Sequence, residues 1–147
     1  MVRVGFDTKL LVYAELEPES DKGLRAFSVL SGSTRDSVIA AQVFGEFLNV
    51  VRRKKPDALP AAILQVERYR RVVGTPSTTL DAVKTAIDVA QEQKIQFWDS
   101  LICVVTAQAG ATILLSEDMQ DGMDVRGLKI VNPFDAKNDA LVGRLLG

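Results

Sequence analysis

Short apolar runs alternate with longer stretches of helical periodicity along this chain, and the alternation is what most constrains its fold. The apolar runs occupy residues 2–6, 37–41, 72–73, 112–115 and 128–131. Helical patterns follow Asp7, cover residues 22–30, 42–55, 60–71, 79–93 and 99–109, and return near the C-terminus. Continuous apolar runs separated by helices are typical of parallel strands covered on both faces. The sequence therefore predicts a single α/β domain over residues 1–147.

Two of the expected helices have distinct relations to the core. In the helix over residues 79–93, apolar side chains recur at helical spacing, so we expect one face to be buried: Leu80, Val83, Ile87 and Ala90. The helix over residues 99–109 is apolar on nearly all sides and should therefore be buried as a whole.

The amino-acid composition excludes several classes of catalytic site. The 147 residues include no histidine and one cysteine, Cys103. Histidine-based triads and acid–base pairs are therefore excluded, and a zinc site is disfavoured. A lone cysteine fits a reducing compartment, and neither a signal peptide nor a membrane span is evident, so we expect a cytoplasmic protein without a membrane partner.

Four carboxylates follow or flank the expected strands where a parallel sheet binds its ligands. Asp7 follows the first strand, and Asp118 lies just beyond the fourth. Glu46 lies early in the helix after the second strand, and Asp99 opens the helix before the fourth. Because ligands bind at the carboxyl ends of parallel strands, these acids should meet at one edge. Four carboxylates there would repel one another without a cation, and their hard oxygens suit Mg²⁺ or Mn²⁺.

Each of these acids also has a structural interpretation when it is taken alone. Asp7 and Asp99 suit helix N-caps, and Asp118 suits a turn. Glu46 suits the solvent-facing side of its helix. Only the expected convergence of all four favours a metal site.

Several segments together resemble the PIN-domain family, and in particular the VapC-type toxins of bacterial toxin–antitoxin pairs. The matching segments are residues 6–14, 41–47, 97–102, 114–122 and 131–134. Their order and spacing, and the Ser-Glu-Asp and Asn-Pro-Phe sequences near the C-terminus, carry the resemblance over nearly the whole chain.

The resemblance implies a PIN-like three-layer sandwich, with a parallel five-stranded sheet of order 3-2-1-4-5 and helices on both faces. It also implies a metal-dependent endoribonuclease that hydrolyses RNA phosphodiester bonds with Mg²⁺ or Mn²⁺. The catalytic and metal-binding residues would be Asp7, Glu46, Asp99 and Asp118. The further implied partners are a second copy of the chain and a small antitoxin that places an arginine in the acidic groove.

Three more residues match positions that support the acids in that family. Thr8 and Ser116 correspond to hydroxyl residues that would orient ligands or water, and Asp121 is a secondary candidate for the same role. Lys9 departs from the family, which usually has a small polar residue there. We interpret Lys9 either as a surface lysine or as a group that contacts the scissile phosphate or lowers metal affinity.

The charge balance leaves the mode of RNA binding open. The chain carries 18 basic and 19 acidic residues, and the balance becomes positive once the four acids are assigned to a metal. Arg52 and Arg53, beside Lys54 and Lys55, are candidate phosphate contacts, although basic residues at a helix C-terminus also complement its dipole.

Four alternatives to the toxin nuclease stay open. A receiver-like phosphoacceptor domain would need adjacent acids after the first strand, where only Asp7 lies. A nucleotide-binding module lacks its glycine-rich loop. A catalytically inactive PIN-like module that binds RNA or protein, and a nuclease of RNA maturation, share every motif named above.

Overall fold

The computed structural model describes residues 2–33 and 36–146. In this part of the chain, five strands form one sheet with the order β2-β1-β3-β5-β4. The strands are β1 (Val4–Phe6), β2 (Ser37–Val38), β3 (Ile113–Leu115), β4 (Asp124–Val125) and β5 (Leu128–Val131). Neighbours β2, β1, β3 and β5 run parallel, as predicted, whereas β4 pairs antiparallel with β5. The α/β architecture is confirmed, but the sheet is mixed rather than fully parallel.

The predicted third strand is reduced to a single bridge. Val72 is still the last residue of a helix, and the parallel bridge next to β2 joins Val38 to Gly74. The neighbour order predicted for the other strands, 2-1-4-5, corresponds to β2-β1-β3-β5 and is confirmed. The extra strand β4 arises from a tight hairpin at Arg126 and Gly127, both of which have positive φ. Such a pair of φ values is typical of a two-residue hairpin turn.

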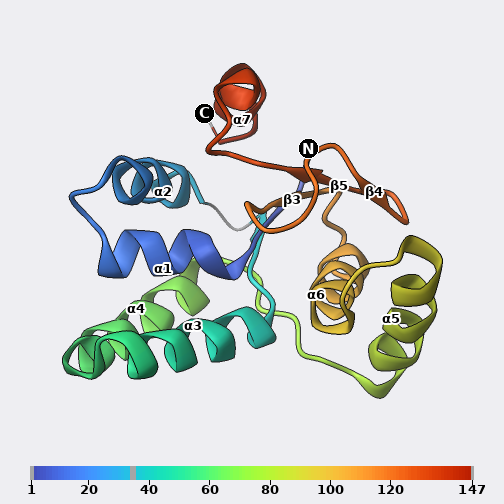
Figure 1. The fold of residues 1–147 in the computed structure, drawn as a ribbon, viewed down its shortest axis with the longest axis horizontal. Helices are drawn as coiled ribbons and strands as arrows, with labels where there is room; N and C mark the ends of the chain where they lie inside the picture. Colours follow the sequence, from blue (N-terminus) through green and yellow to red (C-terminus); the bar gives the residue numbers. More distant parts are fainter. Residues whose placement is uncertain (1, 34–35, 147) are drawn as a thin grey trace.

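Seven helices lie on the two sides of this sheet in the described residues. They are α1 (Thr8–Leu16), α2 (Asp21–Ser31), α3 (Ala41–Lys54), α4 (Leu59–Val72), α5 (Leu80–Gln93), α6 (Phe97–Gln108) and α7 (Asp139–Leu146). Helix α7 lies on the opposite side of the sheet from α5 and α6 (Figure 1). Helix α1 packs against both α2 and α3, and α5 packs against α6. None of the described helices is long and apolar enough to cross a membrane.

Helix α6 is the most buried helix, as its sequence predicted. Every residue from Ser100 to Thr106 is buried. The predicted face of α5 is wrong in part: Val83 and Ala90 are partly buried, but Leu80 and Ile87 are 71% and 47% exposed, and the buried residues are Ala82, Ala86 and Val89.

The small side chains of α5 explain this rotation. Two of the three buried side chains are alanines, which allow close approach to α6. The Ser100 hydroxyl of α6 donates a hydrogen bond of 2.8 Å to the Ala86 carbonyl of α5. This contact between a buried side chain and a helix backbone fixes how the two helices face each other, and so positions the start of α6.

Candidate metal-binding and catalytic site

Asp7 is a buried carboxylate at the junction between β1 and α1. Its side chain caps α1 by accepting a hydrogen bond of 2.7 Å from the Thr8 backbone N–H. The Ser116 hydroxyl donates to its other oxygen at 2.7 Å. The N-cap interpretation of Asp7 is therefore confirmed, and the second oxygen links it to the loop after β3, where Asp118 lies.

Burial raises the pKa of Asp7 from 3.8 to about 6. The hydrogen bonds from Ser116 and Thr8 oppose this rise, while the negative charges of Asp99 and Asp118 add to it. Asp7 is only 4% exposed. A carboxylate that is both buried and close to two like charges is stabilised by any cation that enters the site.

Asp99 lies in the first turn of α6 and faces the same group of acids. The N-cap interpretation of Asp99 is wrong, because the cap is Gln96, whose side chain accepts from the Asp99 backbone N–H at 3.1 Å. Its carboxylate is thus not used in capping. Burial raises the pKa of Asp99, and the charges of Asp118 and Glu46 raise it further. Asp118 therefore lies close enough to act on both Asp7 and Asp99, and Glu46 close enough to act on Asp99.

Glu46 is held by two polar side chains and does not point freely into solvent. The Thr8 hydroxyl donates to Glu46 Oε1 at 3.1 Å, and Gln42 Nε2 donates to Glu46 Oε2 at 3.1 Å. Gln42 also donates to the backbone carbonyl of Trp98 at 3.2 Å, which ties α3 to the start of α6. The sequence prediction did not include Gln42. Its position one helical turn before Glu46 was the signal that could have identified it.

Asp118 and Lys9 form an ion pair at the open side of this group. Lys9 Nζ lies 2.7 Å from Asp118 Oδ1, and both side chains are 45% exposed. This hydrogen bond with Asp118 raises the pKa of Lys9, so the lysine is charged at neutral pH. Lys9 is thus a partly exposed lysine on a helix, as one of its two interpretations predicted, but it is paired with Asp118. Its predicted contact with a phosphate stays a prediction.

Glu117 is a functional neighbour that the sequence prediction missed. It accepts a hydrogen bond of 2.5 Å from the Tyr13 hydroxyl, forms a close ion pair with Lys22, and lies 3.7 Å from Lys9. Burial opposes ionisation of Glu117, but the bonds from Lys22 and Tyr13 outweigh it and lower the pKa. Because Glu117 directly precedes Asp118, these contacts anchor the Asp118 loop to α1 and α2.

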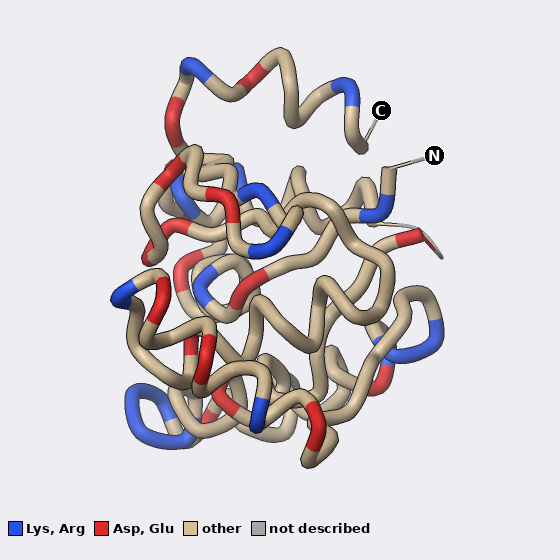
Figure 2. Tube along the Cα trace, turned by 90° about the vertical axis from the view of Figure 1, so that its right-hand side faces the viewer, with Lys and Arg blue, Asp and Glu red and all other residues tan. Residues whose placement is uncertain are grey.

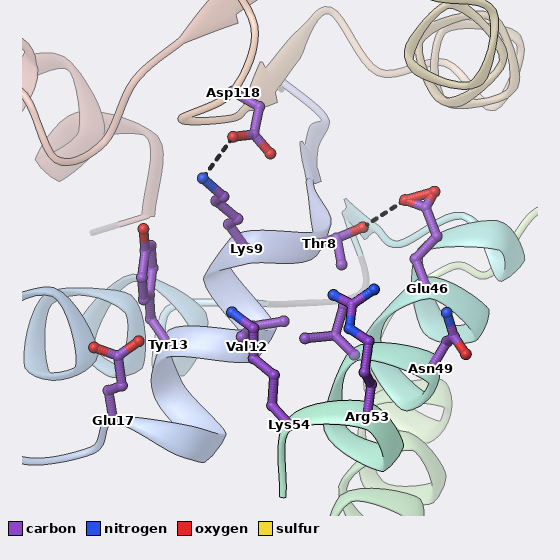
Figure 3. A pocket seen from close by; sticks show the side chains of 11 residues that line it. Thr8, Lys9, Val12, Tyr13, Glu17, Glu46, Asn49, Arg53, Lys54 and Asp118 are labelled. Carbon is purple, nitrogen blue, oxygen red and sulfur yellow. Dashed lines mark hydrogen bonds and ion pairs between the residues drawn. The ribbon is translucent and has the colours of Figure 1, made fainter.

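A cavity of about 530 Å³ opens between α1 and α3, and its two ends differ in charge. Glu46 and Asp118 line one end together with Thr8 and Lys9. Arg53 and Lys54, from the last turn of α3, extend into it from the other end (Figure 3).

The predicted phosphate contacts Arg52 and Arg53 differ in position. Arg53 lines the cavity, whereas Arg52 donates to the Asn49 side chain at 3.2 Å and is not among the lining residues. Acidic and basic positions are interspersed along the chain trace in Figure 2.

Asp121 makes its contacts elsewhere. Its Oδ1 accepts hydrogen bonds from the Asn132 backbone and the Asn138 side chain, and its Oδ2 pairs with Lys137. The Asn132 backbone bond is the main cause that lowers the pKa of Asp121. These contacts give Asp121 a structural role in holding the C-terminal segment. Its predicted role beside the metal is not supported by any of them.

The donor set of the site fits a hard divalent cation in chemistry, although the acids do not form a closed cage. Within residues 2–33 and 36–146, no three His, Cys, Asp or Glu side chains converge into a ready-made metal cluster. The mutual repulsion of the carboxylates nevertheless favours a cation. Gln42 Oε1 adds a buried oxygen that has no hydrogen-bond partner among the described residues. Its acceptor capacity is therefore unused in the described part of the structure.

Comparison with known proteins adds the fold family. No protein-family model and no curated protein sequence matches the chain. Among solved structures, a toxin–antitoxin complex from Klebsiella pneumoniae is similar over 90% of this chain and 98% of that chain, with 17% identity and a TM-score of 0.68. Mycobacterium tuberculosis VapC20, described as a toxin that cleaves the sarcin–ricin loop, matches over 78% and 89%, with 17% identity and a TM-score of 0.65.

A third structure agrees with these two. VapBC2 from Rickettsia felis, bound to a DNA fragment from its promoter, matches over 90% of this chain and 98% of that chain, with 16% identity and a TM-score of 0.62. The chain has the VapC-type PIN fold. Asp99 and Asp118 lie close enough to Asp7 to raise its pKa, and Asp118 and Glu46 do the same for Asp99, whereas the role of the four acids as metal ligands stays a prediction.

Proposed function

We propose that this protein is a metal-dependent endoribonuclease and the toxin of a type II toxin–antitoxin pair. The observation that carries the proposal is the buried Asp7, whose pKa is raised by burial and by the charges of Asp99 and Asp118. Strongly perturbed carboxylates are typical of functional sites, and two further acids of the proposed site, Glu46 and Asp118, line the cavity. The PIN fold of the chain makes a nuclease the chemistry that such a site most readily supports.

The four acids would hold Mg²⁺ or Mn²⁺ through their carboxylate oxygens. A divalent cation here supplies Lewis-acid activation of a water and neutralises charge on the phosphate. Ser116 and Thr8 keep Asp7 and Glu46 in fixed orientations through the hydrogen bonds described above. Since the chain has no histidine, these oxygens supply the acid–base chemistry that the protein itself can contribute.

Arg53 and Lys54 are suited to bind an RNA phosphate next to the scissile one. Both line the cavity that reaches Asp118, and neither forms an ion pair with a described residue. These two cations attract the RNA backbone, whereas the carboxylates of Glu46 and Asp118 in the same cavity repel it until a metal is bound. The substrate would therefore enter between α1 and α3, with its backbone over Arg53.

An antitoxin and a second copy of the chain are the proposed protein partners. One of the similar structures is a toxin–antitoxin complex, and another is VapBC2 bound to a DNA fragment from its promoter. The acidic end of the cavity offers several acceptors to an incoming guanidinium, which binds carboxylates with two parallel hydrogen bonds. Exposed apolar side chains such as Phe27 and Leu80 could take part in a homodimer interface. The cytoplasmic location stays a prediction from the sequence.

One observation favours a second candidate, an inactive PIN-like module that binds RNA or protein. Lys9 already neutralises Asp118, which is one of the four proposed metal ligands. A cation supplied by the chain itself would make the divalent ion unnecessary for stability. An additional role in RNA maturation stays a prediction.

Cleavage of a mixed RNA pool distinguishes the two candidates. Wild type and Asp99→Asn are compared with Mg²⁺ or Mn²⁺, with and without EDTA. Asp99 is suited to this comparison because its carboxylate neither caps α6 nor forms a hydrogen bond or ion pair with any described residue. The nuclease predicts cleavage that needs metal and is lost in the variant. RNA binding by both proteins without cleavage by either would favour the inactive module.

A further inference from the structure

Lys9 lies within the proposed metal site, but the proposed metal chemistry does not use it. It lies in the first turn of α1, next to Thr8, whose hydroxyl donates a hydrogen bond to Glu46. Lys9 itself forms an ion pair with Asp118. In Figure 3 its side chain reaches from α1 directly to Asp118. Lys9 is therefore the one basic side chain that contacts any of the four acids within the described part of the chain.

Glu117, the other carboxylate near Lys9, does not depend on Lys9 for a cationic partner. Glu117 is 3.7 Å from Lys9 but already accepts from Tyr13 and pairs closely with Lys22. The short contact of Lys9 is with Asp118 alone, at 2.7 Å. Two cations cannot share the same carboxylate oxygen without repulsion, so a divalent ion that binds Asp118 Oδ1 has to displace the ammonium group of Lys9.

We propose that Lys9 is a built-in counter-ion that holds Asp118 out of metal coordination until an RNA phosphate draws the lysine away. This inference rests on the proposed metal-dependent nuclease and adds a control over when its site assembles. Metal and RNA then bind cooperatively. RNA draws Lys9 away from Asp118 and so favours the metal, and the metal displaces Lys9 from Asp118 and so frees it to bind the RNA phosphate. By linkage, the gain in metal affinity on RNA binding equals the gain in RNA affinity on metal binding.

The surroundings of Lys9 allow this exchange of partners. The lysine and Asp118 are both half-exposed, and the flexible four-carbon stem of a lysine lets its ammonium group change position at low cost. Both residues line the cavity that Arg53 and Lys54 enter from the other end. A phosphate held in this cavity comes within the same space as the Lys9 side chain and offers it an anionic partner.

Mn²⁺ binding to the full chain tests the inference without relying on activity. Titrations followed by electron paramagnetic resonance compare wild type with Lys9→Met, first without RNA. Removal of the counter-ion is expected to tighten Mn²⁺ binding by about tenfold, within the usual range of coupling between sites. The titrations are then repeated with a short phosphorothioate oligoribonucleotide, which is checked for intactness afterwards. The oligoribonucleotide should tighten Mn²⁺ binding to wild type by about tenfold and Mn²⁺ binding to Lys9→Met by clearly less.

Two matched variants separate this effect from a general change in charge. Lys22→Met removes a lysine that contacts Glu117 but not Asp118. Arg53→Met removes a cation that lines the same cavity and pairs with no described carboxylate. Both are expected to change Mn²⁺ affinity without RNA by less than about twofold, since neither competes for a ligand oxygen.

The outcomes distinguish failure of the inference from failure of the proposed function. Equal Mn²⁺ affinity of wild type and Lys9→Met, or an equal gain in either control variant, overturns the counter-ion role and leaves the metal site standing. Absence of Mn²⁺ binding to wild type and Lys9→Met alike removes the metal site itself, and the inference with it.

Discussion

Replacing Asp7 with asparagine should stabilise the protein at neutral pH when no divalent metal is present. The pKa of Asp7 rises from 3.8 to about 6 on folding, chiefly because of burial. The folded state therefore holds the proton more tightly than the unfolded state, and ionisation opposes folding. This penalty develops as the pH rises through about 4 to 6, and above that range it amounts to about 3 kcal/mol at ~1.36 kcal/mol per pKa unit.

Asparagine removes the charge but keeps most of the local contacts. It is as good an N-cap as aspartate, so the bond from the Thr8 backbone is retained. The bond from the Ser116 hydroxyl becomes a bond between neutral groups, which reduces the gain. We therefore expect Asp7→Asn to raise the free energy of unfolding by about 1–3 kcal/mol at pH 7.5 and by less than about 1 kcal/mol at pH 4.

Urea unfolding in EDTA at the two pH values measures this difference. Asp121→Asn is the matched control, because hydrogen bonds, the Asn132 backbone bond first, lower the pKa of Asp121. The free energy of unfolding should fall in that variant at pH 7.5. A lower stability of Asp7→Asn at pH 7.5, or a gain that does not change with pH, would refute the assigned role of burial at Asp7.

Two further variants test the RNA path and the packing of α5. Arg53→Ala should weaken binding of a single-stranded oligoribonucleotide in EDTA by about tenfold and reduce the slope of log affinity against log salt concentration by about 0.7. Arg52 does not line the cavity, so Arg52→Ala should change the affinity and the slope little. Equal losses in filter binding would contradict the distinction between the two arginines. Ala86→Leu, at a fully buried position, should cost about 1–3 kcal/mol in thermal or urea unfolding, whereas Ile87→Asn on the exposed face should change stability by less than about 0.5 kcal/mol. The reverse order would restore the face predicted from periodicity.

The positions of Asp7 and Asp118 could be predicted because they depend on where strands end. Asp7 follows β1 directly, and Asp118 follows β3 after two residues, so a parallel sheet brings both to one edge. Short apolar runs define such strands well, and β5 has the bounds that the sequence predicted, Leu128–Val131. The prediction that residues 1–147 form one domain stays a prediction.

The elements that were mispredicted depend on tertiary packing or on turn geometry. The exposed side of α5 carries Leu80 and Ile87, whereas the packed side is rich in alanine, so apolar periodicity indicated the wrong face. The strand β4 depends on a turn in which Arg126 adopts a positive φ, and arginine gives no signal for that conformation. In place of the expected strand at residues 72–73, α4 ends at Val72. Pairing with β2 is limited to one bridge, which joins Val38 to Gly74.

The side-chain partners of the site were even less predictable. Lys9 and Asp118 are far apart in the sequence, and their ion pair depends on the path of the loop after β3. Tyr13 of α1 and Glu117 of that loop are likewise far apart in the sequence and form a hydrogen bond. Long-range pairs of this kind have no local pattern. They follow from the fold and could be inferred only once it was known.

The fate of the attacking oxygen tests the central claim most directly. RNA is cleaved by the wild-type protein with Mn²⁺ in water enriched in oxygen-18, and the ends of the products are analysed by mass spectrometry. Hydrolysis at the carboxylate site predicts a 5′-phosphate that carries one heavy oxygen and a 3′-hydroxyl, with no product from Asp99→Asn. Products with a 2′,3′-cyclic phosphate and no heavy oxygen would instead show attack by the 2′-hydroxyl of the RNA, and would contradict the metal-dependent hydrolysis proposed for Asp7, Glu46, Asp99 and Asp118.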